Sequence, residues 1–214
     1  MSIALETPVL CEISEKEEQE PQEAVIADSH DAELVARART GDPNAFELLV
    51  RRYRNEVFAF SYHFLRNREQ AWDVSQEVFI KAHRALTRFR GDASFKTWLM
   101  RITANQCKDF LKKRRLQTVS FDDGRYAQDA PTHVLAPDRS LEAQEIGEAV
   151  EQALAKLSHK HRTAFILREF EGLSYEEMAQ VMDCSIGTVM SRLHHARKKL
   201  QRGLIQMGLM GADR

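Results

Sequence analysis

The sequence predicts an all-α protein with two small helical domains joined by a flexible linker. Apolar residues recur at steps of three and four through most of the chain, which is the spacing of amphipathic helices. No segment sustains the alternation of apolar and polar residues that is typical of a strand. The helical period disappears among polar residues and prolines in 116–140, which predicts the linker. The domains are therefore expected over residues 31–115 and 141–204, with residues 205–214 as a tail.

The charge of the chain is unevenly distributed. Ten of the 32 acidic residues, but only one of the 31 basic residues, lie in residues 1–33, so the rest of the chain carries a net charge of +8. Because the first segment has few large apolar residues, residues 1–30 are expected to form an acidic disordered leader. It could serve as a solubilising tail or compete for basic surfaces. The basic remainder favours a polyanionic partner.

The composition argues against several classes of protein. There is no run of about 18 apolar residues and no secretory signal, so neither a membrane span nor export is predicted. Cys11, Cys107 and Cys184 are widely separated without a metal-binding spacing, which favours a reducing, cytoplasmic setting. His159 and His161 also lack neighbouring ligands. We therefore expect no catalytic site, no metal site and no cofactor.

In the first domain, helices are predicted wherever the apolar period holds. A short amphipathic turn around Leu34 and Val35 ends at the turn signal Gly41–Asn44. Longer helices are expected over residues 45–65, 70–89 and 95–115. Phe89–Ser94 combines turn residues with no period, so it is predicted to be a loop.

In the second domain, helical spacing resumes at Leu141 and continues past the middle of the domain. Ser174 and Glu177 form a capping-box signature, which predicts the start of a short helix. The pattern breaks before Ser185, which is a good N-cap for a final helix. The residues of that helix expected to face inward are Val189, Leu193, Ala196 and Leu200.

Two helices joined by a tight turn, the second strongly basic, indicate a helix-turn-helix over residues 172–200. Thr188, Ser191, Arg192 and His195 share another face of the second helix, where short polar and basic side chains suit the DNA major groove. The alternative is an ordinary helical hairpin with a solvated basic face. The capping box, the turn and the basic helix together favour DNA as the partner.

Three features of the first domain narrow the function. Asp73, Gln76 and Glu77 share a helix face that could dock on a basic protein surface, although a solvated face is the ordinary interpretation. The loop Phe89–Phe95 enters an aromatic helix, where rings could stack on unpaired bases or simply pack the core. A basic cluster ends that helix and could bind phosphates or only favour the helix C-terminus; it comprises Lys108, Lys112, Lys113, Arg114 and Arg115.

Taken together, these segments resemble a known family. Residues 73–82, 89–99 and 101–105 resemble region 2 of bacterial extracytoplasmic-function (group IV) RNA polymerase sigma factors. Leu157 with residues 162–176 and 187–193 resembles their region 4. The resemblance spans residues 31–203 in the right order, with a linker between the two regions, so it is far more specific than a helix-turn-helix alone.

The resemblance implies a factor that is not an enzyme, binds core RNA polymerase, recognises promoter DNA and initiates transcription by melting and capturing the minus-ten strand. The implied polymerase-binding residues are Asp73, Gln76 and Glu77. Those implied for the minus-ten element are Phe89, Arg90, Gly91, Asp92, Ser94, Phe95, Lys96, Asn105, Lys108, Lys112, Arg114 and Arg115. Those implied for the minus-thirty-five element are Tyr175, Thr188, Ser191, Arg192, His195, Arg197 and Lys198.

The same resemblance implies partners: the β′ clamp and β subunits of core RNA polymerase, promoter DNA and an anti-sigma factor. Met190 and His195 depart from the family pattern, because basic residues are frequent at both positions. Two other classes of function stay open. A stand-alone helix-turn-helix regulator would not need the acidic face or the aromatic loop, and a helical protein-interaction adaptor would not need the basic helix.

Overall fold

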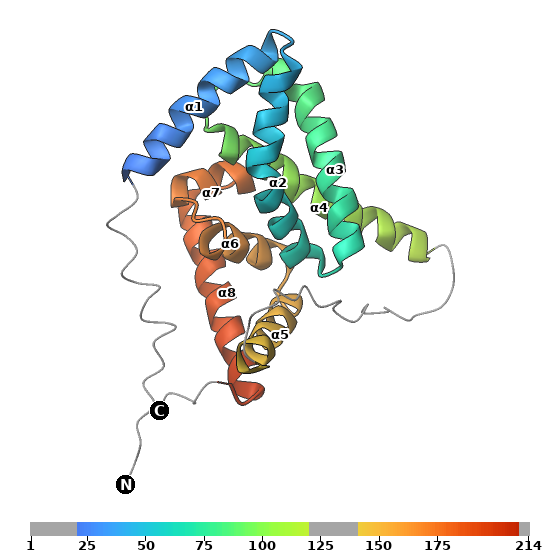
Figure 1. Cartoon of the computed structure of the whole chain (residues 1–214). Coiled ribbons are helices and arrows are strands. Elements are labelled where there is room, and N and C mark those ends of the chain that lie inside the picture. Colours follow the sequence, from blue (N-terminus) through green and yellow to red (C-terminus); the bar gives the residue numbers. More distant parts are fainter. Residues whose placement is uncertain (1–20, 120–140, 210–214) are drawn as a thin grey trace. The chain divides into compact units, whose positions relative to one another are not determined.

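The computed structural model describes residues 21–119 and 141–209, with side chains placed from residue 30 to 114 and from 147 to 209. Its elements are α1 (Pro21–Arg39), α2 (Pro43–Leu65), α3 (Arg68–Ala85), the 3-10 turn η1 (Leu86–Arg88), α4 (Phe95–Val119), α5 (Leu141–Ala155), α6 (His159–Glu169), α7 (Tyr175–Met182) and α8 (Ile186–Gln206) (Figure 1). No strand occurs within these ranges, and the predicted all-α class is confirmed. The chain divides into two compact units, Met1–Leu49 and Val50–Arg214.

The first unit holds α1 and the start of α2, joined by a tight turn. Gly41 adopts a φ of 95°, a left-handed conformation that favours glycine. The Asp42 carboxylate caps α2 by accepting a hydrogen bond from the Asn44 backbone N–H at 2.9 Å. The Arg37 guanidinium bonds the same carboxylate at 2.8 Å and is the main reason that the pKa of Asp42 is lowered. A turn is present where it was predicted, but it ends at Asp42, because Pro43 and Asn44 already belong to α2.

In the second unit, the continuation of α2 packs with α3 and α4 around an apolar core. The fully buried side chains include Val57, Phe60 and Phe64 of α2 and Leu99 and Met100 of α4. The three residues of α2 repeat at steps of three and four, which is why this segment forms an amphipathic helix rather than a strand. The Asn67 side chain starts α3 by accepting a hydrogen bond from the Gln70 backbone N–H.

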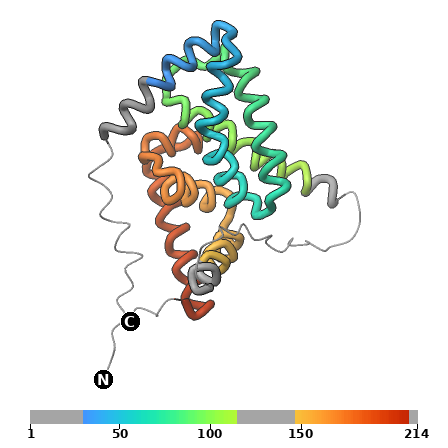
Figure 2. Tube along the Cα trace, viewed as in Figure 1, coloured from blue at the N-terminus to red at the C-terminus, as the bar shows by residue number. Residues whose placement is uncertain are grey.

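The C-terminal part of this unit is built from α5 to α8, and Figure 2 shows α6, α7 and α8 following one another through short connections. An apolar cluster joins α5 to α8 and contains Ala153, Leu154, Leu157, Ala196 and Leu200. Gly203 supports this packing, because a Cβ there would lie 3.4 Å from the Cβ of Ala153.

Several predicted boundaries differ in the structure. Residues 21–30, expected in the disordered leader, belong to α1. Pro21 suits the first helical position, and Ala and Glu follow it, so local helix propensity outweighs the acidic composition there. Helix α4 continues to Val119, past the predicted linker start at 116. The helix predicted over 70–89 begins at Arg68 and ends in η1. Residues 1–20, 120–140 and 210–214 lie outside the described residues.

Candidate nucleic-acid interface

The predicted helix-turn-helix is present as α7 and α8. The Ser174 hydroxyl accepts a hydrogen bond from the Glu177 backbone N–H at 3.2 Å, and the Glu177 carboxylate accepts one from the Ser174 N–H at 2.9 Å, which completes the capping box. Asp183 ends α7 in the left-handed conformation, with φ 51° and ψ 57°. Aspartate is one of the few residues that tolerate it. Ser185 then caps α8 through the Thr188 N–H at 3.3 Å.

The inward face of α8 is also as predicted. Val189, Leu193, Ala196 and Leu200 are all buried. Because they form one stripe along the helix, the remaining faces of α8 carry its polar and basic side chains toward the surface.

Several polar side chains on the outward faces are bonded within their own motif. The Thr188 and Ser185 hydroxyls lie 2.9 Å apart and share a hydrogen bond. The Arg192 guanidinium donates to the Cys184 sulfur at 3.3 Å. His195 donates from Nδ1 to the Ser191 carbonyl at 2.6 Å, which leaves Nε2 as the ring nitrogen that can face a partner.

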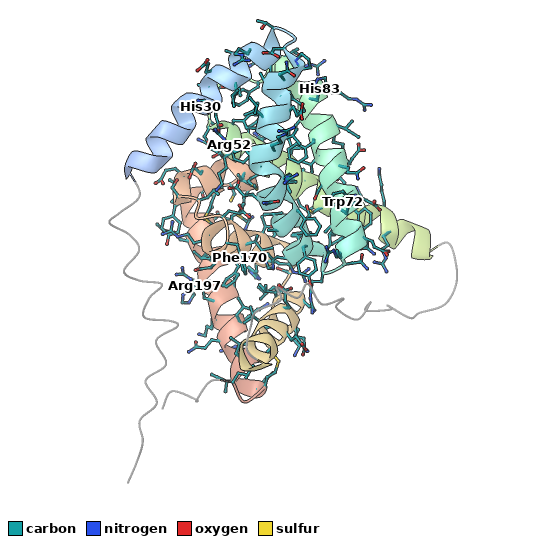
Figure 3. The ribbon with its side chains drawn as sticks, in the orientation of Figure 1. His30, Arg52, Trp72, His83, Phe170 and Arg197 are labelled. Atoms are coloured by element: carbon teal, nitrogen blue, oxygen red, sulfur yellow. The ribbon has the colours of Figure 1, made fainter. Side chains whose placement is uncertain are left out.

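Other residues predicted for the duplex element lie around this surface. Arg197, labelled in Figure 3, donates to the Glu169 carboxylate of α6 at 2.6 and 3.0 Å. The Arg168 guanidinium lies over the Tyr175 ring, with its central carbon 5.2 Å from the centroid of that ring. Lys198 is exposed on α8. To contact a phosphate, the Arg197 guanidinium would therefore have to break its ion pair with Glu169 or share its donors between the two groups.

The loop Phe89–Ser94 is confirmed, but its flanking aromatic rings are buried. Phe89 is 9% exposed and Phe95 only 3%. The Phe89 and Trp98 ring centroids lie 5.0 Å apart, and those of Phe95 and Trp98 lie 5.6 Å apart. In this structure the two phenylalanines pack the base of the loop rather than present a face to a base, because apolar burial outweighs exposure of the rings.

Exposed polar residues surround the loop instead. Arg90, Gly91 and Asp92 are exposed, and Gly91 has a φ of 80° that favours glycine. A cavity of about 490 Å³ lies against the loop and is lined by residues 88–93 with Thr97, Trp98 and Arg101 of α4 and Gln180 and Asp183 of the helix-turn-helix. It thus combines the Trp98 ring with three arginines (Arg88, Arg90 and Arg101) and two aspartates (Asp92 and Asp183). Rings and guanidinium groups are suited to bases and phosphates.

A polar stripe continues from this cavity along α4. Arg101, Asn105, Lys108 and Lys112 are all exposed and follow one another at i, i+4, i+7 and i+11. Residues at this spacing share one helix face. Arg101 was not among the predicted site residues, although its position one turn before Asn105 is a sequence signal that could have found it. The side chain of Arg115 lies outside the described ranges, and Arg114 is half-buried.

The start of α4 is bonded differently. The Ser94 hydroxyl caps the helix by accepting from the Thr97 N–H at 3.1 Å. Lys96 donates to the Glu171 backbone carbonyl at 3.1 Å and lies 3.8 Å from a Glu56 carboxylate oxygen. The Thr97 hydroxyl donates to the Glu177 carboxylate at 2.9 Å. Ser94 and Lys96 are therefore both occupied with contacts inside the protein.

The predicted polymerase-binding residues lie on α3. Asp73 and Gln76 are exposed and Glu77 is half-buried. Two large apolar side chains flank them, Trp72 at 59% exposure (Figure 3) and Ile80 at 45%. The sequence prediction missed both, although a tryptophan beside polar residues of an amphipathic helix is a visible signal. Exposed aromatic anchors beside a polar rim are typical of a protein interface.

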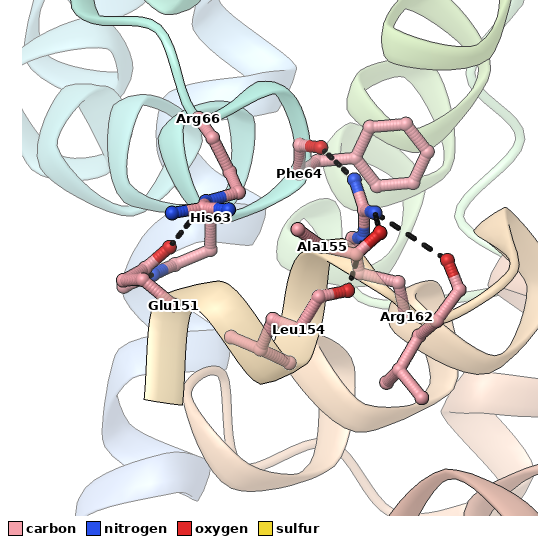
Figure 4. A network of polar contacts seen from close by, with 8 residues as sticks. His63, Phe64, Arg66, Glu151, Leu154, Ala155 and Arg162 are labelled. Carbon is pink, nitrogen blue, oxygen red and sulfur yellow. Dashed lines mark hydrogen bonds and ion pairs between the residues drawn. The ribbon is translucent and has the colours of Figure 1, made fainter. Parts of the chain in front are cut away.

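One buried cation serves the fold. Arg162 is 8% exposed and donates to the backbone carbonyls of Leu154 at 3.0 Å, Ala155 at 2.7 Å and Phe64 at 2.6 Å (Figure 4). Burial is the main cause that lowers its pKa to about 10. Since these carbonyls end α5 and α2, the guanidinium closes two helix C-termini at once.

A second set of ionic contacts lies beside it. Glu151 accepts from His63 Nδ1 at 2.6 Å, and its other oxygen lies 3.6 Å from Arg66 Nε (Figure 4). The His63 ring stacks on Phe170, with centroids 4.1 Å apart.

Among the helices that the structure describes, none combines the length and apolarity that a membrane span needs.

Comparison with family models agrees with this organisation. The model of sigma-70 region 2 matches residues 49–117, which contain α3, the loop and most of α4. The model of sigma-70 region 4 matches residues 147–200, which contain α6, α7 and most of α8. The two predicted helical regions are thereby confirmed.

Whole proteins are similar as well. The RNA polymerase sigma-H factor of Pseudomonas aeruginosa is 40% identical over 186 residues, which cover 84% of this chain and 96% of that protein. The ECF RNA polymerase sigma-E factor of Haemophilus influenzae is 37% identical over 181 residues, covering 80% and 93%. A solved structure of the sigma factor RpoE in complex with the anti-sigma factor NepR, from Bartonella quintana, matches with a TM-score of 0.65 and 28% identity, covering 74% and 96%.

Proposed function

Because this chain belongs to the extracytoplasmic-function family of RNA polymerase sigma factors, we propose that it binds core RNA polymerase, recognises promoter DNA and initiates transcription by melting and capturing the minus-ten strand. Members of this family are regulatory transcription factors rather than enzymes. The observation that carries the proposal is the pairing of a basic helix-turn-helix with a second polar surface, formed by the 88–93 loop and the exposed stripe of α4. A stand-alone duplex-binding regulator would need only the first.

The α8 surface is suited to the minus-thirty-five duplex. Its N-terminal half carries Thr188, Ser191 and Arg192, and basic residues follow toward its C-terminus. An exposed helix of this kind enters the major groove with its first turns nearest the bases, while later cations contact phosphates.

The loop and α4 are suited to the minus-ten strand. The three arginines beside Trp98 would hold an extruded base, and Asn105, Lys108 and Lys112 would follow the strand backbone. Because unstacking a base costs a few kcal/mol, a site that stabilises one extruded base links strand opening to sequence. In this proposal Phe89 and Phe95 support the loop from the core.

The α3 face would dock on the β′ clamp of the polymerase. Asp73, Gln76 and Glu77 provide polar and acidic groups, and Trp72 and Ile80 add apolar area that is exposed in this chain. We also extend to this protein the partner named for the Bartonella quintana relative, an anti-sigma factor, which would compete with polymerase or DNA for these surfaces. Both polymerase and promoter imply a cytoplasmic setting.

Run-off transcription with purified core polymerase on a promoter library tests the proposal. We expect promoter-specific transcripts from the wild-type chain. Asp73→Ala combined with Glu77→Ala should weaken co-elution with core by about tenfold, on the order of 1.4 kcal/mol. Arg192→Ala should keep core binding and lose minus-thirty-five-dependent initiation. A wild-type protein that neither co-elutes with core nor gives a specific transcript, yet binds duplex DNA, would instead be a stand-alone regulator.

A further inference from the structure

Two large apolar side chains are exposed on the first turns of α8. Ile186 is 38% exposed and Met190 is 48% exposed, the latter among the highest values for an apolar residue in the described ranges. They stand four residues apart, so they are neighbours on the helix surface. They place an apolar surface on the first turns of a helix whose other exposed side chains are mostly polar or basic.

The polar neighbours of this pair are partly engaged within the protein. Thr188 shares a hydrogen bond with Ser185, and Arg192 donates to the Cys184 sulfur. The His195 Nδ1 donates to its own helix backbone. The side chains that sequence reasoning assigned to base reading are thus less free than they seemed, whereas Ile186 and Met190 project from the same turns.

Gly187 adds an independent observation. It lies inside the first turn of α8, and a Cβ at this position would meet no atom within 4 Å. Neither left-handed backbone nor internal packing requires a glycine there, and glycine weakens a helix relative to alanine. A remaining reason for glycine is close approach of the helix backbone to a ligand.

The surrounding charge selects the kind of partner. Exposed cations, including Lys198 and Lys199, follow on the same helix, and Arg192 lies within the first two turns. A cationic surround fits a polyanion, and the apolar group that B-DNA presents in its major groove is the thymine C5-methyl. An unbranched methionine thioether adapts readily to such a surface.

We propose, on the premise of the promoter-binding function above, that Ile186, Gly187 and Met190 form an apolar contact that recognises thymine methyl groups in the minus-thirty-five duplex. Gly187 lets the helix approach the groove closely, and Met190 makes the main methyl contact. Four residues of helix rise about 6 Å and one base-pair step about 3.4 Å, so the two side chains reach thymines within about two base pairs of each other.

The test uses holoenzyme assembled from the full chain and core polymerase on a promoter selected from a randomised minus-thirty-five library. Each thymine of the element, on either strand, is replaced by deoxyuridine, which removes only the methyl. Wild-type holoenzyme should lose about fourfold in affinity at one or two positions, the value of one buried methyl. Met190→Ala should lower affinity for the thymine promoter and abolish the difference between thymine and deoxyuridine there.

Leu209→Ala is the matched control, because Leu209 is a similarly exposed apolar residue, 41% exposed, beyond the end of α8. It should keep the full methyl effect. Gly187→Ala should raise the thermal midpoint of the free chain by about 2 °C while weakening promoter binding by holoenzyme. A variant that is more stable but binds the promoter more weakly has lost close approach to DNA, because a folding defect would lower the thermal midpoint as well.

The outcomes distinguish this inference from the function on which it rests. Promoter-specific binding without any methyl effect, or a methyl effect that survives in Met190→Ala, would overturn the inference and leave the sigma-factor function intact. Absence of any promoter-specific binding by wild-type holoenzyme would overturn both.

Discussion

The α5–α6 corner and helix α4 are both rich in basic residues, yet their cations have opposite environments in the structure. Arg162 is buried and donates to the carbonyls of Leu154, Ala155 and Phe64. Arg101, Lys108 and Lys112 instead line one exposed face of α4. A basic residue is therefore a stronger candidate for nucleic-acid binding when its donors are not already satisfied inside the protein. Helix α8 lies between these extremes, since Arg197 is exposed but paired with Glu169.

The largest expected effect comes from replacing the buried cation, Arg162. Arg162→Met removes the donors for three or more helix-end carbonyls and should lower the free energy of unfolding by about 3 kcal/mol. Arg162→Lys should lie between, because an ammonium cannot match the geometry of the guanidinium fork. Urea denaturation followed by circular dichroism measures both. In folded protein, the salt dependence of DNA binding should not change, and a change there would place Arg162 on the DNA surface.

A buried carboxyl beside the start of α4 gives the next effect. Glu171 is 7% exposed, and burial raises its pKa to about 7 from an ordinary 4.5, with Lys96 opposing and Glu56 adding to the shift. Between these pH values the folded state holds a proton that the unfolded state has released, so stability falls as pH rises through this window. Glu171→Gln should therefore stabilise the protein at pH 8 by on the order of 2 kcal/mol and change little near pH 4.5.

The matched control for this prediction is Glu176→Gln, which neutralises an exposed carboxylate on α7. Thermal unfolding of both variants and wild type across pH 4.5–8 gives the comparison. If Glu171→Gln keeps the wild-type dependence of stability on pH, Glu171 is ionised in the folded protein across this range and the expected stabilisation is excluded.

The exposed side of the comparison is tested on α4. Lys108→Ala combined with Lys112→Ala should leave unfolding nearly unchanged and weaken holoenzyme binding to a minus-ten single strand by about tenfold. The slope of log affinity against log salt should become shallower by about 1.4, since each phosphate contact on a single strand contributes about 0.7. Lys113→Ala is the control, because Lys113 is exposed on α4 but lies off the stripe. An unchanged salt slope in the double variant would exclude these lysines from the strand path.

How much the sequence could predict depends on how far apart in the chain the interacting residues lie. The capping box at Ser174 and Glu177, the cap at Ser185 and the inward stripe of α8 depend on residues three or four apart, so the local pattern was sufficient. The bond from Arg162 to the Phe64 carbonyl joins residues 98 positions apart, and no local pattern reports it. Burial of Phe89 and Phe95 likewise depends on packing against Trp98 and Tyr53, which a loop signal does not contain.

The smallest expected effect concerns the ion pair between Arg197 of α8 and Glu169 of α6. Arg197 donates two hydrogen bonds to Glu169, yet its side chain is 51% exposed, and a pair of this kind contributes only about 0.5 kcal/mol. Glu169→Gln should therefore cost little stability, release Arg197 and remove one negative charge near α8, so duplex affinity should rise about twofold. The gain should disappear when Arg197→Ala is added, because there is then no guanidinium to release. Fluorescence anisotropy on a minus-thirty-five duplex measures both affinities. Equal gains with and without Arg197 would show that Glu169 acts only by long-range repulsion of the DNA. The ion pair would then not restrain Arg197, and the cations of α8 would be as available to DNA as those of α4.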